Sequence, residues 1–256
     1  MKQAILGMVL LFCFEVQAYD KLISSQRVSI AASSYLPPYV MADQDSGIQL
    51  DILKAALRQQ GITHFDIRYM SNKRAEKQLQ VGEVDIALNY AGYLDGQIFP
   101  SNSLLDYQNV AISLTQKNLK IDTPYDLIGK SVLAFQNATA FLGQPFKSLT
   151  TKLLSYDEVV NQAAQIDHLM KNWVDVIILE RRVFFYYLNE YEKKQPSLPI
   201  QIHTIFAEVA RPAYFNNAAL KDTFNAGLEK IKDSGEYHAI ISLDGTEYAD
   251  LVPNNF

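Results

Sequence analysis

The feature that most constrains the fold is a pair of short apolar segments at comparable places in two stretches of the chain. Residues 84–88 read VDIAL and residues 174–179 read VDVIIL. Runs of this length and composition are typical of strands that are buried on both faces of a parallel sheet. Helix-like and strand-like segments alternate around both of them, which indicates parallel sheets with crossover helices. The sequence therefore predicts an α/β protein.

Two α/β units follow one another along the chain, and a final helix comes after the second unit. The expected strands are Arg27–Ala32, 65–70, 84–88, 107–114, Ser131–Phe135, 174–179 and 200–207. The expected helices are 48–60, 71–81, one opened by a capping box at 155–158, 183–191 and 220–231. The connections between the units are short, as expected for two lobes that hinge.

The first 18 residues have the parts of a secretory signal. Lys2 supplies a positive start, residues 4–14 form an apolar run, and Val16-Gln17-Ala18 offers a cleavage site after Ala18. The alternative, a membrane anchor, is weaker because the run is too short to cross a bilayer. Export to the periplasm is therefore expected. Cleavage removes Cys13, the only cysteine, so the mature chain should have no disulfide.

Composition excludes several classes of protein. The chain has 23 basic and 28 acidic residues, which are interspersed and give a net charge of −5. Proteins that bind nucleic acid need a basic face, so we expect no nucleic-acid partner. The four histidines have no metal-ligand spacing, and no zinc-protease, nucleophile-elbow or phosphate-loop motif occurs. We therefore expect no metal and no cofactor.

Several short motifs occur in a particular order along residues 27–241. They are Pro37-Pro38-Tyr39, Gly47 followed by Gln49 to Ile52, Leu79 to Asp85 (LQVGEVD), Asp126 to Val132 (DLIGKSV), Asn217 to Leu220, Phe224 to Leu228, and Gly235-Glu236-Tyr237. In this order and spacing they resemble the family 3 extracellular solute-binding proteins, which are the receptors of many amino-acid ABC importers.

The resemblance implies the type II periplasmic-binding-protein fold, in which two lobes, each with a central mostly parallel sheet, are joined by a two-strand hinge. Residues 1–18 would be the signal peptide, 19–113 plus 209–256 lobe 1, and 114–208 lobe 2. The implied function is a periplasmic receptor that closes its lobes over a small polar, amino-acid-like molecule. Its partner would be an ABC permease or a membrane sensor, and we expect a monomer.

Candidate ligand-binding residues in lobe 1 follow two of the strands. In open parallel sheets, ligands bind beyond the carboxyl ends of the strands. Tyr35 and Tyr39 follow the first strand, where the family places an aromatic ring against the ligand. Asn89, Tyr90 and Ala91 follow residues 84–88, where the family presents polar side chains and backbone N–H groups. The alternative for the two tyrosines is an ordinary surface loop.

The family's carboxylate-binding arginine is missing from lobe 1. Residues 92–98 (GYLDGQI) contain no arginine, and no Lys or Arg occurs between Lys77 and Lys117. Arg74 is a possible substitute near the start of the preceding helix, although a solvated helix charge is the simpler interpretation. Gln97 is a possible neutral replacement. This departure leaves the ligand class open.

Candidate residues in lobe 2 also lie after strands. Asn137 and Thr139 follow Ser131–Phe135, where a hydroxyl and N–H groups can hold a carboxylate, or can simply cap a helix. Glu180 ends the strand at 174–179, at the position where an acid of the family pairs with the amino group of the ligand. Its structural alternative is to cap the helix that follows.

The main alternative function is an enzyme on the same scaffold, similar to the cyclohexadienyl dehydratases. Such an enzyme needs a placed acid, and Glu180 is the one obvious candidate. A sensor without an importer, or a chain whose site has degraded, are further alternatives.

Overall fold

The computed structural model describes residues 27–33, 35–90, 94 and 96–242. The predicted signal peptide and Ala91 lie outside these residues. The chain divides into two compact units: unit 1 is formed by residues up to Leu105 together with those from Arg211, and unit 2 by Asp106–Ala210. Two strands, β6 (Phe99–Leu114) and β11 (Glu208–Phe215), pass from one unit to the other. The predicted lobe boundaries, 113/114 and 208/209, also fall within these strands.

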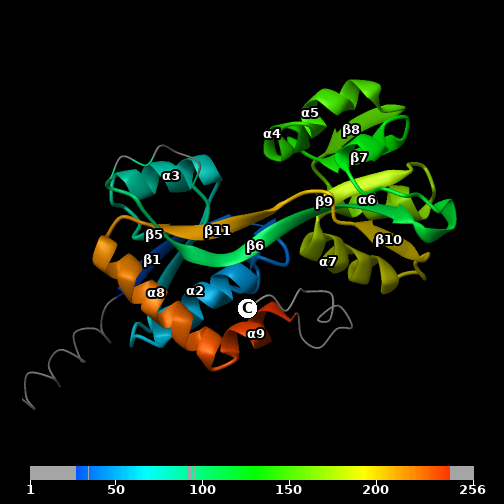
Figure 1. Ribbon diagram of the computed structural model, residues 1–256. Helices are drawn as coiled ribbons and strands as arrows, with labels where there is room; N and C mark the ends of the chain where they lie inside the picture. Colours follow the sequence, from blue (N-terminus) through cyan, green and yellow to red (C-terminus); the bar gives the residue numbers. More distant parts are fainter. Residues whose placement is uncertain (1–26, 34, 91–93, 95, 243–256) are drawn as a thin grey trace, which may run out of the picture. The chain divides into compact units, whose positions relative to one another are not determined.

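Unit 1 is built around a mostly parallel sheet (Figure 1). In it, β1 (Arg27–Ala32) pairs in parallel with β4 (His64–Tyr69) and with β5 (Ile86–Ala87), and β11 pairs antiparallel with β5. A small hairpin of β2 (Tyr35–Leu36) and β3 (Val40–Met41) follows β1. The helices of unit 1 are α2 (Ile48–Arg58), α3 (Asn72–Gln80), α8 (Ala218–Asp233) and α9 (Glu236–Ile241).

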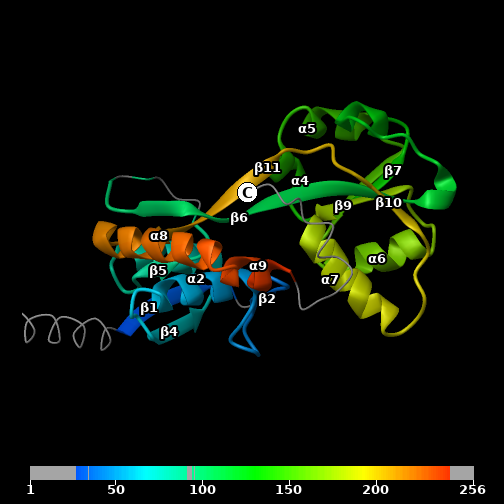
Figure 2. The ribbon, with the colours of Figure 1, turned by 60° about the horizontal axis from the view of Figure 1, so that its bottom comes forward.

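Helices α2 and α8 pack tightly against each other (Figure 1 and Figure 2). Apolar side chains at helical spacing bury one face of each helix, among them Leu53 and Leu57 in α2 and Leu228 in α8. Gly227 permits the close approach, because a Cβ at this position would lie 1.9 Å from the carbonyl oxygen of Ala56. The late helix thus completes the core of a unit that begins some 200 residues earlier in the chain.

Unit 2 repeats the arrangement with its own parallel strands. Strand β7 (Ser131–Phe135) pairs in parallel with β8 (Ser155–Val159) and β9 (Val176–Glu180), and β6 pairs antiparallel with β9 and β10 (Ile200–His203). The α-helices are α4 (Ala138–Leu142), α5 (Phe146–Leu149), α6 (Gln162–Met170) and α7 (Arg181–Glu192). Three short 3-10 helices are η1 (Thr115–Lys117), η2 (Pro124–Leu127) and η3 (Thr150–Lys152).

The two crossing strands, β6 and β11, are also hydrogen-bonded neighbours. The strand path therefore runs β4-β1-β5-β11-β6-β9-β7-β8, with β10 attached to β6. Each unit has its own set of parallel strands, and the two sets are joined through the two strands that pass between the units, as the sequence predicted. No helix in the described part of the chain is long and apolar enough to cross a membrane.

The aspartates of VDIAL and VDVIIL have the same structural role in the two units. In unit 1, Oδ2 of Asp85 accepts hydrogen bonds from the backbone N–H of Ser29 at 2.8 Å and from its hydroxyl at 2.6 Å. In unit 2, Oδ2 of Asp175 accepts the same two bonds from Ser131 at 2.9 and 2.8 Å. We call these two pairs the serine–aspartate clasps. Each one fixes the start of a central strand, β5 or β9, to a neighbouring strand.

One predicted element is wrong. Residues 155–158 were expected to open a helix as a capping box, but Ser155–Val159 is strand β8, in register with β7. The helix begins later, at Gln162, where the side chain of Asn161 accepts a hydrogen bond from the N–H of Ala163 at 3.1 Å. The sequence SYDEV alternates between more and less exposed side chains, which is the period of a strand.

Strand β6 is longer than expected. The prediction was 107–114, whereas β6 begins at Phe99. Residues 99–106 contain Pro100 and four polar side chains, which lowers the strand signal in this segment. Ser101 and Ser103 accept hydrogen bonds through their hydroxyls from the N–H groups of Ala213 and Arg211 at 3.0 and 2.9 Å. Side-chain hydroxyls thus help to hold β11 beside this polar stretch.

Candidate functional site

Three of the predicted residues of unit 1, Tyr35, Asn89 and Tyr90, lie in segments that follow the carboxyl ends of its strands. Because β1 and β5 are parallel neighbours, the segments that follow them begin at the same edge. Tyr35 lies in β2, the strand that comes after β1, and Asn89 and Tyr90 come one residue after the end of β5. Asn89 is half-buried. Ala91, the next predicted residue, is outside the described residues.

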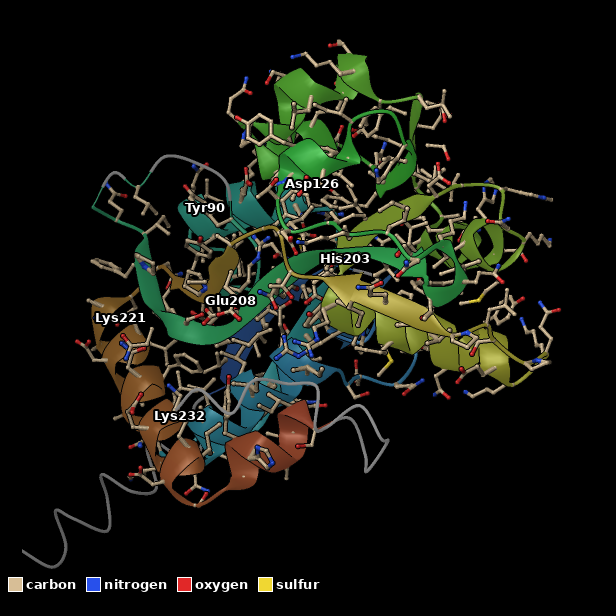
Figure 3. All side chains as sticks on the ribbon, turned by 45° about the vertical axis from the view of Figure 1, so that its right-hand side comes forward. Tyr90, Asp126, His203, Glu208, Lys221 and Lys232 are labelled. Atoms are coloured by element: carbon tan, nitrogen blue, oxygen red, sulfur yellow. The ribbon has the colours of Figure 1, made fainter. Side chains whose placement is uncertain are left out.

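The two described tyrosine side chains of this prediction are buried. Tyr39 is fully buried, in the turn that contains the cis peptide bond Pro37-Pro38. Tyr90, labelled in Figure 3, is also buried; its ring centroid is 5.3 Å from that of Tyr214, and its hydroxyl accepts a hydrogen bond from Gln80 at 2.9 Å. Burial places Tyr39 in the core of unit 1 and corrects the surface-loop alternative; its role against a ligand remains a prediction. The ligand role of Tyr90 remains a prediction.

The ligand-binding role of Arg74 remains a prediction. The residue is exposed on α3, which agrees with the solvated helix charge that the sequence also allowed. The structure instead brings a different cation to this part of unit 1. Burial raises the pKa of Tyr214 above its ordinary value. The positive charge of Arg211, also on β11, is close enough to Tyr214 to act in the opposite direction, but its effect is the smaller one.

Sequence reasoning did not single out Arg211 and Tyr214, because they lie on β11, a strand that was not among those predicted. Strand β11 pairs with β5 in antiparallel register, with Tyr214 opposite Ala87. Residues before Tyr214 on β11 therefore run past the carboxyl end of β5. The pairing register of β11 with β5 places Arg211 near Asn89 and Tyr90. This register is known only from the three-dimensional structure, and the sequence alone gives no indication of it.

The carboxyl edge of unit 2 holds an internal carboxylate. Glu158, near the end of β8, accepts hydrogen bonds from the N–H of Asn137 at 2.6 Å and from the N–H of Thr139 at 3.1 Å. The hydroxyl of Tyr156 donates a third bond to it at 2.7 Å. The predicted role of Asn137 and Thr139 was to hold a ligand carboxylate or carbonyl. Their backbone N–H groups bind Glu158 instead.

Glu158 is held in its ionised form. Burial acts to raise the pKa of its carboxyl, but the hydrogen bonds from Tyr156, Thr139 and Asn137 outweigh burial and lower the pKa below its ordinary value. The same arrangement raises the pKa of Tyr156, through burial and through its bond to the carboxylate. The edge of unit 2 therefore has a permanent negative charge beside β7.

Glu180 caps helix α7. Its Oε2 accepts hydrogen bonds from the N–H of Arg182 at 2.8 Å and of Val183 at 3.0 Å, and its Oε1 lies 3.4 Å from the N–H of Gln108. The residue is buried. This is the structural alternative that the sequence offered for Glu180, and the carboxylate already has partners for both oxygens. Any contact with a ligand amine would come in addition to the cap.

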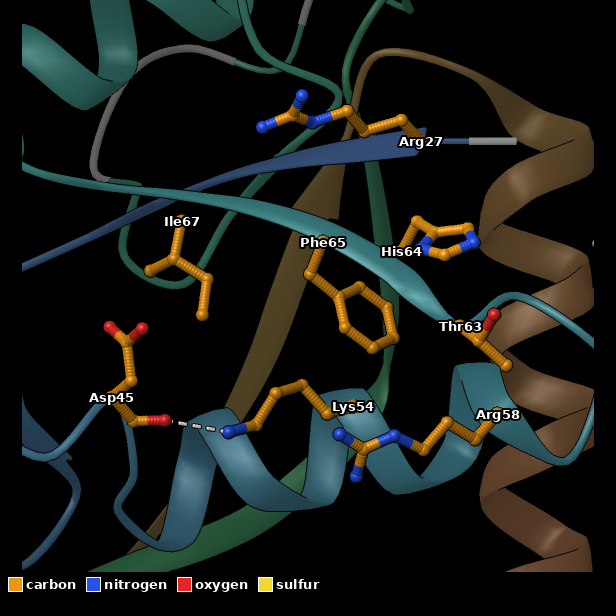
Figure 4. A pocket seen from close by; sticks show the side chains of 8 residues that line it. All are labelled: Arg27, Asp45, Lys54, Arg58, Thr63, His64, Phe65 and Ile67. Atoms are coloured by element: carbon orange, nitrogen blue, oxygen red, sulfur yellow. Dashed lines mark hydrogen bonds between the residues drawn. The ribbon is translucent and has the colours of Figure 1, made fainter. Parts of the chain in front are cut away.

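A separate pocket of about 620 Å³ lies in unit 1 (Figure 4). It is lined by Arg27, Asp45, Lys54, Arg58, Thr63, His64, Phe65 and Ile67. Figure 4 shows Lys54 and Arg58 reaching from α2 beneath Phe65 of β4, and Lys54 donates a hydrogen bond to the backbone oxygen of Asp45 at 2.7 Å. Arg27 and His64 start the parallel strands β1 and β4, so the pocket extends to the amino edge of the sheet. It contains none of the predicted site residues.

Among the described residues, no group of three or more His, Cys, Asp or Glu side chains could hold a metal ion. The buried His203, labelled in Figure 3, instead forms a hydrogen bond of 2.9 Å with the hydroxyl of Ser113. Burial lowers the pKa of His203, which favours the neutral ring. This histidine belongs to the core of unit 2.

Comparison with known proteins supports the fold. No protein-family model and no curated protein matches the sequence. Many solved structures match the fold. An ancestral arginine-binding protein bound to glutamine is 18% identical, with a TM-score of 0.59, over 84% of this chain and 96% of that one.

Two proteins of Streptococcus pneumoniae match in the same way. The second substrate-binding domain of a putative amino acid ABC transporter is 19% identical, with a TM-score of 0.63, over 84% of this chain and 97% of that one. A substrate-binding protein of an ABC uptake transporter with bound histidine is 20% identical, with a TM-score of 0.61, over 87% and 93%. The α/β fold of two lobes that the sequence predicted is therefore confirmed.

Proposed function

We propose that the chain is a periplasmic solute-binding receptor that closes its two lobes over a small polar molecule. The observation that carries the proposal is the fold. It matches, over nearly their whole length, proteins whose structures were solved with an amino acid bound. The ligand would contact the carboxyl edges of the two sheets, where ligands of open α/β sheets bind. Its partner would be an ABC permease or a membrane sensor that recognises the loaded form.

Residues of both edges support this proposal. In unit 1, the half-buried Asn89 and the buried Tyr90 follow β5, and the charge of Arg211 is close to Tyr214 on the adjacent strand. In unit 2, Asn137 follows β7, Glu158 lies near the end of β8, and Glu180 is the last residue of β9; the three strands are neighbours in the sheet. A small number of polar groups that converge on one place of a rigid scaffold is typical of a small-molecule site.

The enzyme alternative depends on Glu180, the one acid that the sequence offered for it. Glu180 accepts two hydrogen bonds from N–H groups at the start of α7, so its carboxylate already serves as the cap of that helix. This arrangement favours the receptor over a dehydratase. Turnover of prephenate or arogenate by the purified protein would reverse that preference.

The test is a thermal-shift screen of small polar metabolites with residues 19–256. A solute at 100 times its dissociation constant stabilises a receptor by about 2.7 kcal/mol. For a chain of this size such a gain raises the melting temperature by roughly 5–10 °C. A panel of amino acids, amines and sugars that produces no shift would contradict the proposal.

A matched pair of variants locates the site. Asn89→Ala should weaken binding of the best solute by about tenfold, because a half-buried amide at the strand tip would lose its bond to the ligand. Gln201→Ala, which changes an exposed amide on β10, should leave binding unchanged. Equal affinities for the two variants would place the site elsewhere.

Export through a cleaved signal peptide is part of the proposal. Residues 1–18 lie outside the described residues, so the support comes from the sequence pattern of a positive start, an apolar run and a small residue at position 18. N-terminal sequencing of the protein from a periplasmic extract should begin at Tyr19. A chain that retains its first residues in the cytoplasm would contradict this part.

A further inference from the structure

At the carboxyl edge of unit 2, the side chain of Glu158 occupies backbone N–H groups to which a ligand carboxylate could otherwise bind. The N–H groups of Asn137 and Thr139, in the turn after β7, are two backbone donors at this edge, and both donate to Glu158. The oxygens of Glu158 also accept the bond from Tyr156, so the carboxylate is anchored on the side of its own strand as well. A second carboxylate here would find these donors occupied and would meet a like charge.

The cations of this edge are already balanced by acids. Arg182 donates to the backbone oxygen of Asp106 at 3.0 Å and lies 3.9 Å from Glu180. Arg181 is half-buried; burial and the charge of Arg182 lower its pKa, while Glu180 and Glu208 act in the opposite direction. Two arginines therefore face two acids, and Glu158 remains as an additional negative charge.

The same edge also exposes large apolar side chains. Phe141, in α4 after β7, is 66% exposed, and Val160, directly after β8, is 74% exposed. Phe141 keeps one contact with Phe135 at the end of β7, with ring centroids 6.1 Å apart. Exposed side chains of this size next to a candidate site favour a ligand with an apolar surface.

From the occupied N–H groups, the surplus negative charge and the exposed Phe141 and Val160, we infer that the solute of this receptor is an organic amine with an apolar body and no carboxylate. This inference rests on the proposed function and narrows its ligand class. It also agrees with residues 92–98 of unit 1, which contain no arginine. An α-amino acid would not find the family's arginine at those positions, and its carboxylate would be repelled by Glu158 in unit 2.

Matched pairs of compounds that differ only by a carboxylate test this inference. Isothermal titration would compare phenethylamine with phenylalanine, tyramine with tyrosine and histamine with histidine on the purified mature protein. We expect at least one amine to bind ten or more times as tightly as its amino acid. A result in which the amino acids bind equally well or better overturns the inference and leaves the proposed receptor function standing.

Two acid-to-amide variants identify the residue responsible. Glu158→Gln keeps the size of the side chain and removes its charge, so the preference for the amine should fall to within about threefold. Asp157→Asn removes a charge from the adjacent, exposed residue of β8 and should leave the preference unchanged. A full preference in Glu158→Gln, with folding verified by circular dichroism, overturns the role of Glu158.

The two proposals can fail separately. If no amine, amino acid or other solute of the thermal-shift panel binds, the receptor function itself fails and the ligand class falls with it. If amino acids bind and amines do not, only the ligand class is wrong.

Discussion

The two units have the same construction where their central strands begin and different constructions where those strands end. At the starts of β5 and β9, a serine–aspartate clasp with nearly identical distances is present in both units. At the carboxyl ends, unit 2 binds its own acids, Glu158 and Glu180, to backbone N–H groups. Unit 1 instead places Asn89 and Tyr90 at this edge.

This difference separates scaffold from site. A parallel sheet with crossover helices needs its central strand fixed in register, and the clasp does this in either unit independently of any ligand. The carboxyl edge carries no such requirement, so its side chains are the ones that differ with function. The clasps, which both units share, therefore belong to the scaffold. Residues for ligand recognition should be sought at the carboxyl edges, where the units differ.

The largest expected effect comes from breaking a clasp. The clasp of unit 2 has an added ion pair, since Nζ of Lys117 lies 2.5 Å from Oδ1 of Asp175. Asp175→Ala should lower the free energy of unfolding by about 3 kcal/mol, and Asp85→Ala, which lacks such a lysine bond, by about 2 kcal/mol. Denaturant titration measures both losses, and hydrogen exchange assigns each to its own unit. Equal losses would mean that the lysine adds nothing.

The pH dependence of stability should come next in size. Burial acts to raise the pKa of Asp175, but bonds from Lys117 and Ser131 outweigh it and lower the pKa to about 2, from an ordinary 3.8. A lowered pKa in the folded state stabilises the protein above pH 4, and this contribution of about 2 kcal/mol is lost as the pH falls from 4 toward 2. Denaturation of Asp175→Asn over this range should show a shallower loss than wild type, and parallel curves would contradict the prediction.

A smaller effect is expected at the carboxyl edge of unit 2. Glu180→Ala removes the cap of α7 and should cost about 1–2 kcal/mol in unfolding free energy. Glu180→Gln retains an oxygen that can accept from the N–H groups, so it should recover most of this stability. If Glu180 also binds a ligand amine, Glu180→Gln should still weaken binding despite its restored stability. Retained affinity would restrict Glu180 to capping.

The smallest effect concerns the lysine that distinguishes the two clasps. Lys117→Met should cost about 1 kcal/mol, because it removes one partly buried ion pair and leaves the serine bonds in place. In this background, Asp175→Ala should become as mild as Asp85→Ala. A double-mutant cycle measures the coupling, and additive losses would show that the lysine and aspartate do not interact.

Most of the fold could be predicted from the sequence, because it depends on repeated local patterns. Residues 84–88 contain the central strand β5, and residues 174–179 contain all of the central strand β9 except its last residue, Glu180. The predicted strands Arg27–Ala32 and Ser131–Phe135 agree with β1 and β7 at both ends. Apolar runs with helices around them leave few alternative arrangements. The error at residues 155–158 arose because a capping box and an edge strand can share the same four residues.

The site was harder to predict, and the wrong helix at residues 155–158 affected it. Once Glu158 was assigned to a helix, its carboxylate could not be placed beside the turn at Asn137, so the N–H groups of that turn were expected to be available for ligand. Glu180 illustrates a second limit. A carboxylate at the end of a strand has the same sequence signature whether it caps the next helix or binds a solute, and only the hydrogen-bond partners distinguish the two roles.

The close contact of Gly227 with Ala56 has a consequence for the order in which the protein matures. Unit 2 is one uninterrupted stretch, Asp106–Ala210. Unit 1 lacks most of β11 and all of α8 and α9 until the last part of the chain has emerged from the ribosome. Since domains fold as units, the N-terminal part of unit 1, which is synthesised first, cannot complete its fold until the C-terminal part has been synthesised.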